Sequence, residues 1–201
     1  MSMQAIRNIL FDLDGTLVNS PIDFAGIKSA LGISPDTDIL GFLESLRPTE
    51  SEAYQKASQI IYDFEFEASK KTVLYEGVEE FLEYLSAESI QMGIVTRNCR
   101  EVAHEQIKSV SGHFLKILTR DDVSNPKPHP ESFEFFHRNF DFLASETLFI
   151  GNHYHDYQFA ENNRMRYLEF VPMLEQTKRE FEFLSYFDLK ENFIAQTPKV
   201  F

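Results

Sequence analysis

The sequence predicts an α/β fold in which a parallel sheet is sandwiched between helices and a helical module follows the first strand. Short apolar runs alternate with segments whose apolar residues are spaced three and four positions apart, as strands alternate with amphipathic helices. This alternation of strands and helices is interrupted once, because residues 20–73 contain only helical patterns. A chain of 201 residues, 43% of them hydrophobic, is long enough for one core and a sizeable insertion.

The apolar runs give the expected strands, which are Ile6–Phe11, Ile90–Thr96, Leu115–Leu118, Leu148–Ile150 and Tyr167–Val171. The expected helices between them are Val78–Leu85, Arg100–Val110 and Pro130–Phe140. Strands joined through helices run parallel in one sheet, and the helices cover both of its faces.

The insertion is expected to hold three helices, which are Phe24–Leu31, Ile39–Leu46 and Ser51–Lys70. Thr49 with Glu52 resembles a capping box at the start of the third. We therefore expect a core of residues 1–18 and 74–201 and a helical domain of residues 19–73.

The tail, residues 173–201, is rich in phenylalanine. This pattern predicts a terminal helix that packs on the sheet; a stripe that binds a partner is the alternative.

The composition narrows the possible partners and the compartment. There are 32 acidic and 19 basic residues, for a formal charge of −13, which argues against nucleic acid or an anionic membrane as the main partner. A single cysteine excludes an internal disulfide and fits a reducing compartment. With no basic leader and no run of about 18 apolar residues, we expect a cytoplasmic protein.

The first expected strand ends abruptly in two acids, Asp12 and Asp14, followed by Gly15 and Thr16. Open α/β sheets bind ligands at the carboxyl ends of their strands. Two carboxylates one residue apart would point to opposite faces of an extended strand, but a glycine lets the backbone turn so that both approach one centre.

Two further motifs suit the binding of a phosphate group. Thr96 ends an expected strand just before a helix, where a hydroxyl group and free backbone N–H groups can hold phosphate oxygens. Lys127 lies in the run Asn125–Pro130, in which prolines on both sides stiffen the backbone. A lysine presented this rigidly suits the neutralisation of a bound dianion or of an aspartate nucleophile.

The last motif is the strand Leu148–Ile150, which runs into Asn152 and Asp156. Asp156 could add a third carboxylate near Asp12 and Asp14 and complete the hard oxygen site that Mg²⁺ prefers.

These four motifs, in this order over about residues 5–172, resemble the haloacid dehalogenase superfamily, most of whose members are phosphatases. The Thr-Arg-Asn and Lys-Pro-His-Pro runs are most similar to its phosphoglycolate-phosphatase-like branch. The resemblance implies a Rossmann-like core with a small helical cap domain. It also implies a Mg²⁺-dependent phosphatase that hydrolyses a small phosphorylated metabolite through an aspartyl-phosphate intermediate.

The resemblance implies a role for each site residue. Asp12 would be the nucleophile, Asp14 the general acid and base, Thr96 a ligand of a phosphoryl oxygen, and Lys127 the bridge between Asp12 and the phosphate. The loop residues expected to bind substrate are Gly15, Thr16, Arg97 and Asn98. The residues expected to hold the metal are Asp12, Asp14, Asn152 and Asp156.

One departure keeps alternatives open. Asn152 stands where the family usually carries an aspartate, so the site loses one negative charge and should bind Mg²⁺ more weakly. The alternative to an active phosphatase is a weakened relative that binds a phosphorylated ligand or a protein partner. A phosphomutase shares the same intermediate, whereas Asp14 argues against a dehalogenase, which needs no general acid there. The sequence allows a monomer or a homodimer.

Overall fold

A computed structural model describes residues 6–47, 52–172 and 182–196 of the chain. The chain divides into two compact units, Met1–Asn19 with Val73–Phe201, and Ser20–Thr72. The larger unit has two hydrophobic clusters and the smaller unit has one of its own. Within the described ranges, every helix is too short or too polar to cross a lipid bilayer.

The larger unit is built on a six-stranded parallel sheet in the order β5-β4-β1-β6-β7-β8. Its strands are β1 (Asn8–Phe11), β4 (Gln91–Val95), β5 (Lys116–Leu118), β6 (Thr147–Gly151), β7 (Arg166–Phe170) and β8 (Glu182–Phe183). The α/β fold with a parallel sheet is therefore confirmed. Strand β1 is central, with Phe11 paired to Ile94 on one side and to Ile150 on the other.

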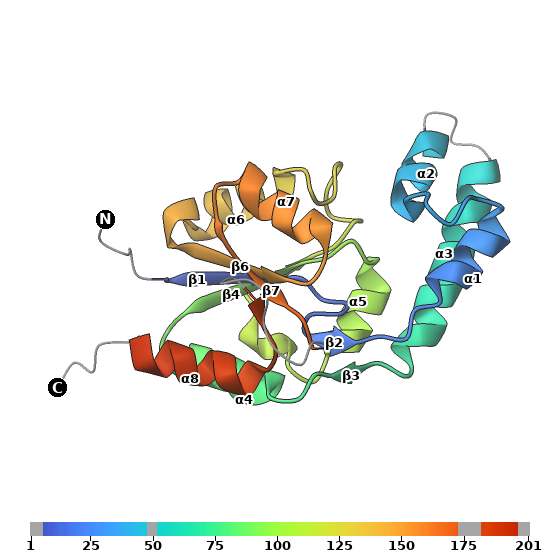
Figure 1. The fold of residues 1–201 in the computed structure, drawn as a ribbon. Helices are drawn as coiled ribbons and strands as arrows, with labels where there is room; N and C mark the ends of the chain where they lie inside the picture. Colours follow the sequence, from blue (N-terminus) through green and yellow to red (C-terminus); the bar gives the residue numbers. More distant parts are fainter. Residues whose placement is uncertain (1–5, 48–51, 173–181, 197–201) are drawn as a thin grey trace. The chain divides into compact units, whose positions relative to one another are not determined.

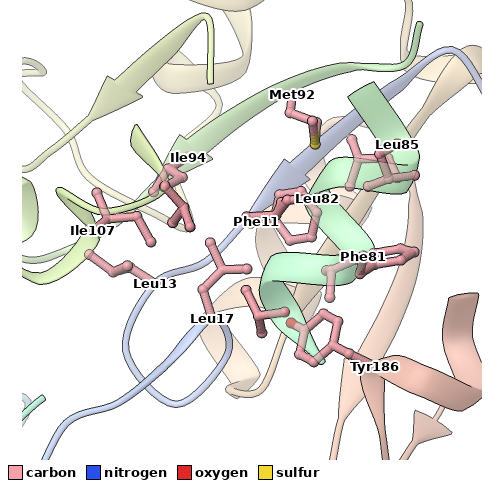
Figure 2. Close-up of a cluster of buried hydrophobic side chains, with 14 of the residues drawn as sticks. Phe11, Leu13, Leu17, Phe81, Leu82, Leu85, Met92, Ile94, Ile107 and Tyr186 are labelled. Carbon is pink, nitrogen blue, oxygen red and sulfur yellow. The ribbon is translucent and has the colours of Figure 1, made fainter. Parts of the chain in front are cut away.

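Helices cover both faces of this sheet, as expected (Figure 1). They are α4 (Val78–Ala87), α5 (Arg100–Ile107), α6 (Glu131–Phe140), α7 (Tyr154–Asn162) and α8 (Tyr186–Gln196). Alternate residues of β1 serve opposite faces. Phe11 packs in a cluster that includes Phe81 of α4 and Tyr186 of α8 (Figure 2), whereas Leu10 belongs to the cluster on the other face with Phe136 of α6.

The smaller unit consists of α1 (Phe24–Leu31), α2 (Ile39–Leu46) and α3 (Glu52–Ser69). The first two helices begin at aspartate caps, because Asp23 accepts the N–H of Gly26 and Asp38 accepts that of Gly41. A separate apolar cluster holds the three helices together, with the buried members Ile27, Leu43, Ala57 and Ile61. The helical insertion is thus confirmed, while the proposed Thr49 capping box lies partly outside the described residues.

Four elements were not expected. β2 (Val18–Asn19) and β3 (Val73–Leu74) form a short antiparallel pair at the two ends of the insertion. Helix α7 begins within the last motif, with His153 as its N-cap and Asp156 in its first turn, and β8 adds a sixth strand to the sheet. The terminal helix was expected, and α8 packs with Tyr186 and Leu189 in the core beside α4. Two phenylalanines of the Phe-rich tail, Phe181 and Phe201, lie outside the described residues.

Candidate active site

The site is built where β1 ends. Asp12 follows β1 directly, its N–H donates to the carbonyl of Ile150 (2.8 Å), and its side chain is buried. The chain then turns at Gly15, whose φ of +80° favours glycine. A Cβ at Gly15 would lie 2.2 Å from Nδ2 of Asn152, so the absence of a side chain also lets the loop after β6 approach.

Lys127 connects two carboxylates at the centre of the site. Its Nζ lies 2.6 Å from Oδ1 of Asp12 and 2.6 Å from Oδ1 of Asp156, and all three side chains are buried. The other oxygen of Asp156 accepts the backbone N–H groups of Asn152 (3.1 Å) and His153 (3.0 Å) at the start of α7. Asp156 therefore fixes Lys127 relative to the loop after β6.

This arrangement perturbs the acidity of the expected nucleophile. Burial, followed by the negative charge of Asp156, raises the pKa of Asp12 from 3.8 to about 7, although Lys127 acts in the opposite direction. Burial alone would lower the pKa of Lys127, but the two carboxylates outweigh it and raise that pKa. Two buried carboxylates thus share one ammonium group, and the centre has an excess of negative charge when both are ionised.

Asp14 is held by two side-chain amides. Oδ2 accepts a hydrogen bond from Nδ2 of Asn98 (2.9 Å), and Oδ1 accepts one from Nε2 of Gln106 on α5 (2.8 Å). Asn98 was expected to bind substrate; its contacts favour a role in holding Asp14, and the substrate role stays a prediction. Gln106 was missed. A polar residue on the buried face of α5 was the available signal.

Thr16 and Asn152 meet beside Asp12. The Thr16 hydroxyl lies 3.2 Å from Oδ1 of Asn152 and 3.4 Å from Oδ2 of Asp12, so its single proton serves one acceptor or the other. Thr16 is fully buried, which favours positioning of these oxygens over the expected contact with substrate.

The strand beside β1 contributes the expected phosphate-binding residues. Thr96 follows β4, and the register of β4 with β1 places it at the same sheet edge as Asp12. Its Oγ1 accepts the N–H of Asn98 (3.1 Å). The carbonyl of Arg97 accepts from Arg120 Nη1 (3.1 Å). Direct binding of substrate by Thr96 and Arg97 stays a prediction.

The oxygen donors fit a hard divalent cation. Oδ2 of Asp12 and Oδ1 of Asn152 both lie beside Thr16, and the backbone carbonyl of Asp14 is close in sequence. Within the described parts of the chain, no three His, Cys, Asp or Glu side chains converge on a metal site. Both oxygens of Asp156 already face N–H donors, so the contacts favour Asp156 as the partner of Lys127 over its expected role as a ligand.

Comparison with known sequences decides the family. The sequence model of the haloacid dehalogenase-like hydrolases matches residues 9–170, which include every motif of the site. The chain belongs to this family. A relative named pyrophosphatase PpaX from Bacillus velezensis is 29% identical over 81% of this chain and 82% of its own. A PpaX from Bacillus cereus is 30% identical over 78% of this chain and 79% of its own.

Several solved structures share the fold. A predicted phosphoglycolate phosphatase from Haemophilus somnus superposes with a TM-score of 0.71 at 22% identity, covering 97% of this chain and 100% of its own. A haloacid dehalogenase-like family hydrolase from Streptococcus pneumoniae gives a TM-score of 0.68 at 22% identity, covering 94% and 98%. At this identity the likeness concerns the fold alone.

Proposed function

We propose that this protein is a Mg²⁺-dependent phosphatase that hydrolyses a small phosphorylated metabolite through an aspartyl-phosphate on Asp12. The observation that carries the proposal is the buried contact of 2.6 Å between Asp12 and Lys127 at the carboxyl end of the sheet. An anionic nucleophile approaches a phosphate dianion only where positive charge offsets the repulsion, and Lys127 supplies such charge at the attacking atom.

The chain's own residues account for both halves of the reaction. An oxygen of Asp12 attacks phosphorus, the bond from phosphorus to the leaving oxygen breaks, and Asp14 gives its proton to that oxygen. Asp14 then takes a proton from water as the water oxygen attacks phosphorus, and the bond to Asp12 breaks to release phosphate. Thr96, at the same sheet edge, is the residue we assign to a phosphoryl oxygen.

The metal would be held by Asp12, Asn152 and the backbone carbonyl of Asp14. When bound, Mg²⁺ neutralises phosphoryl charge and orients the group for in-line attack. It would also offset the excess negative charge that Asp12 and Asp156 place around the single ammonium group of Lys127.

The experiment is hydrolysis of p-nitrophenyl phosphate at saturating Mg²⁺, against EDTA and against Asp12→Asn. We expect turnover that both controls abolish. Because the two relatives cited above carry the name pyrophosphatase, inorganic pyrophosphate and 2-phosphoglycolate should be assayed beside the chromogenic ester to identify the substrate class. Turnover that survives in Asp12→Asn would contradict the mechanism.

A second candidate function rests on Asn152, which lacks the charge of an aspartate. In that case the protein is a weakened relative that binds a phosphorylated ligand without rapid turnover. The distinguishing result is stabilisation of the protein by Mg²⁺ with beryllofluoride, a phosphate analogue, in the absence of hydrolysis of any of the three substrates. Rescue of hydrolysis by Asn152→Asp would assign the weakness to this position.

A further inference from the structure

The side chains of Asp14, Asn98 and Gln106 form a closed set of three hydrogen bonds. Gln106 Nε2 donates to Oδ1 of Asp14 (2.8 Å), and Asn98 Nδ2 donates to Oδ2 (2.9 Å). Asn98 Nδ2 also donates to Oε1 of Gln106 (3.2 Å), so the two amides are joined to each other as well as to the carboxylate. Each oxygen of Asp14 therefore faces its own donor.

The surrounding backbone fixes which way both amides point. Oδ1 of Asn98 accepts the N–H of Cys99 (2.8 Å), and the Asn98 N–H donates to Thr96 Oγ1 (3.1 Å). The NH₂ group of Asn98 must then face Asp14 and Gln106. Because Oε1 of Gln106 accepts from Asn98, its own NH₂ group is directed at Asp14.

The place of Gln106 in α5 makes this contact unusual. Gln106 is 9% exposed and lies on the buried face of the helix with Val102, Ala103 and Ile107. An apolar side chain is the ordinary occupant of such a position, since a buried amide costs free energy unless its groups are hydrogen-bonded. The hydrogen bonds to Asp14 and Asn98 satisfy this amide and connect the core helix to the site.

We propose that Gln106, together with Asn98, is a positioning residue that orients the Asp14 carboxyl group for proton transfer to the leaving group. The proposal rests on the proposed function. Asp14 follows β1 at the Gly15 turn and is only partly buried, so its hydrogen bonds help to set the orientation of its carboxyl group. Proton transfer needs the acid within hydrogen-bond reach of the leaving oxygen, and the two amides limit that rotation.

The test is the dependence of kcat/KM on the acidity of the leaving group, in a series from phenyl to p-nitrophenyl phosphate. A poor leaving group needs the proton, whereas p-nitrophenolate departs with little help. In Gln106→Met we expect kcat/KM to fall about 10- to 100-fold for phenyl phosphate, but by less than about threefold for p-nitrophenyl phosphate. Glu105 lies one position earlier on α5 and is exposed, so Glu105→Gln is the control. Its kcat/KM should equal that of the wild type for every leaving group.

Two further variants keep the test decisive. Gln106→Glu preserves the size of the side chain but places a carboxylate against Asp14. It should make kcat/KM depend more steeply on the acidity of the leaving group. This variant replaces Gln106→Met in the test if Gln106→Met does not fold. In an Asp14→Asn background, Gln106→Met should change kcat/KM by less than about twofold, since the group that it orients no longer carries a transferable proton.

The possible failures are distinguishable. Hydrolysis by the wild type that Asp12→Asn abolishes supports the proposed function by itself. Given that result, an equal loss for every leaving group in both Gln106 variants, or no loss, overturns the positioning role alone. Absence of hydrolysis by the wild type across the series contradicts the proposed function, and the positioning role falls with it.

Discussion

At the scale of single residues, the charge at the centre is unbalanced. Asp12 and Asp156 both contact Lys127 in a buried environment, and the pKa of Asp12 is raised to about 7, first by burial and then by Asp156. A buried carboxylate without sufficient compensation destabilises the folded protein. The charge that suits the site to a cation and a phosphate therefore has a cost in the metal-free protein.

The metal-free protein should lose stability as the pH rises. The pKa of Asp12 is higher in the folded state (about 7) than the ordinary value (3.8). The stabilisation that protonated Asp12 gives the folded protein is therefore fully present below about pH 4 and is lost as the pH rises through about 7. Asp12→Asn removes this loss. In EDTA, we expect its advantage in the free energy of unfolding to be about 2 kcal/mol larger at about pH 7.5 than at about pH 5.

Urea denaturation of both proteins at the two pH values measures this difference. An advantage of Asp12→Asn that does not change with pH would contradict the raised pKa. At the higher pH, added Mg²⁺ should reduce the difference in the free energy of unfolding between Asp12→Asn and the wild type, because a bound cation stabilises ionised Asp12.

Asn152→Asp should strengthen Mg²⁺ binding. The substitution adds a negative charge beside Asp12 while keeping an oxygen that accepts from Thr16. We expect roughly a tenfold lower dissociation constant for Mg²⁺, measured by isothermal titration calorimetry. Asn139→Asp, which adds the same charge on the exposed face of α6, is the control and should leave the constant unchanged. Equal effects of the two substitutions would mean that Asn152 does not ligate the metal.

At the scale of elements, the terminal helix α8 reaches the catalytic loop. The hydroxyl group of Tyr186 donates to the backbone carbonyl of Thr16 (3.1 Å), and the Tyr186 ring packs against Phe81 and Phe170 in the core. Burial raises the pKa of Tyr186 well above its usual value, so the hydroxyl group stays protonated and can donate. The tail thus supports the loop that carries Asp14.

Tyr186→Phe should destabilise the protein while leaving the ring in place. The variant removes the donor and leaves the buried carbonyl of Thr16 unsatisfied, which we expect to cost about 1–2 kcal/mol of the free energy of unfolding. Urea denaturation measures the loss. Tyr84→Phe on the neighbouring helix α4, where the tyrosine is only partly buried, should cost less. A cost below that of Tyr84→Phe would contradict the support of the loop by α8.

Some elements and contacts were predictable from the sequence, and others were not. β1 and the acids after it were predictable, because the apolar run and the Asp-Leu-Asp-Gly-Thr motif are local signals. The short strands β2, β3 and β8 were not, since two paired residues leave no periodicity to detect. The contact between Asp156 and Lys127 was missed for another reason. Which carboxylate pairs with a lysine depends on side-chain packing between distant segments, and so does the reach of Gln106 to Asp14.

At the scale of the whole molecule, the insertion is joined to the larger unit through two short strands that pair with each other. It leaves and re-enters the larger unit through β2 and β3, where Asn19 pairs directly with Val73. The insertion's apolar cluster contains only its own residues, and every residue that we assign to the reaction or the metal belongs to the larger unit. Removing the insertion therefore leaves every member of the two apolar clusters of the larger unit in the chain.

A chain in which an Asn-Gly turn replaces residues 20–72 should fold. The antiparallel pairing of Asn19 with Val73 suits a two-residue hairpin, and Asn-Gly favours the type I′ turn that such hairpins adopt. We expect one cooperative unfolding transition by circular dichroism. Because the assigned residues remain, hydrolysis of p-nitrophenyl phosphate should persist at reduced kcat. Discrimination between small and bulky phosphomonoesters should fall if the insertion acts as a selective cap.

The matched comparison is the same shortened chain carrying Asp12→Asn, which should fold equally well and show no hydrolysis. A shortened chain that does not fold would mean that the larger unit depends on the insertion for stability. One that folds and keeps the substrate preference of the full chain would place selectivity in the loops of the core, around Thr96 and Arg97. Selectivity measured as the ratio of kcat/KM for 2-phosphoglycolate and a bulkier sugar phosphate distinguishes these outcomes, because that ratio depends only on differential transition-state binding.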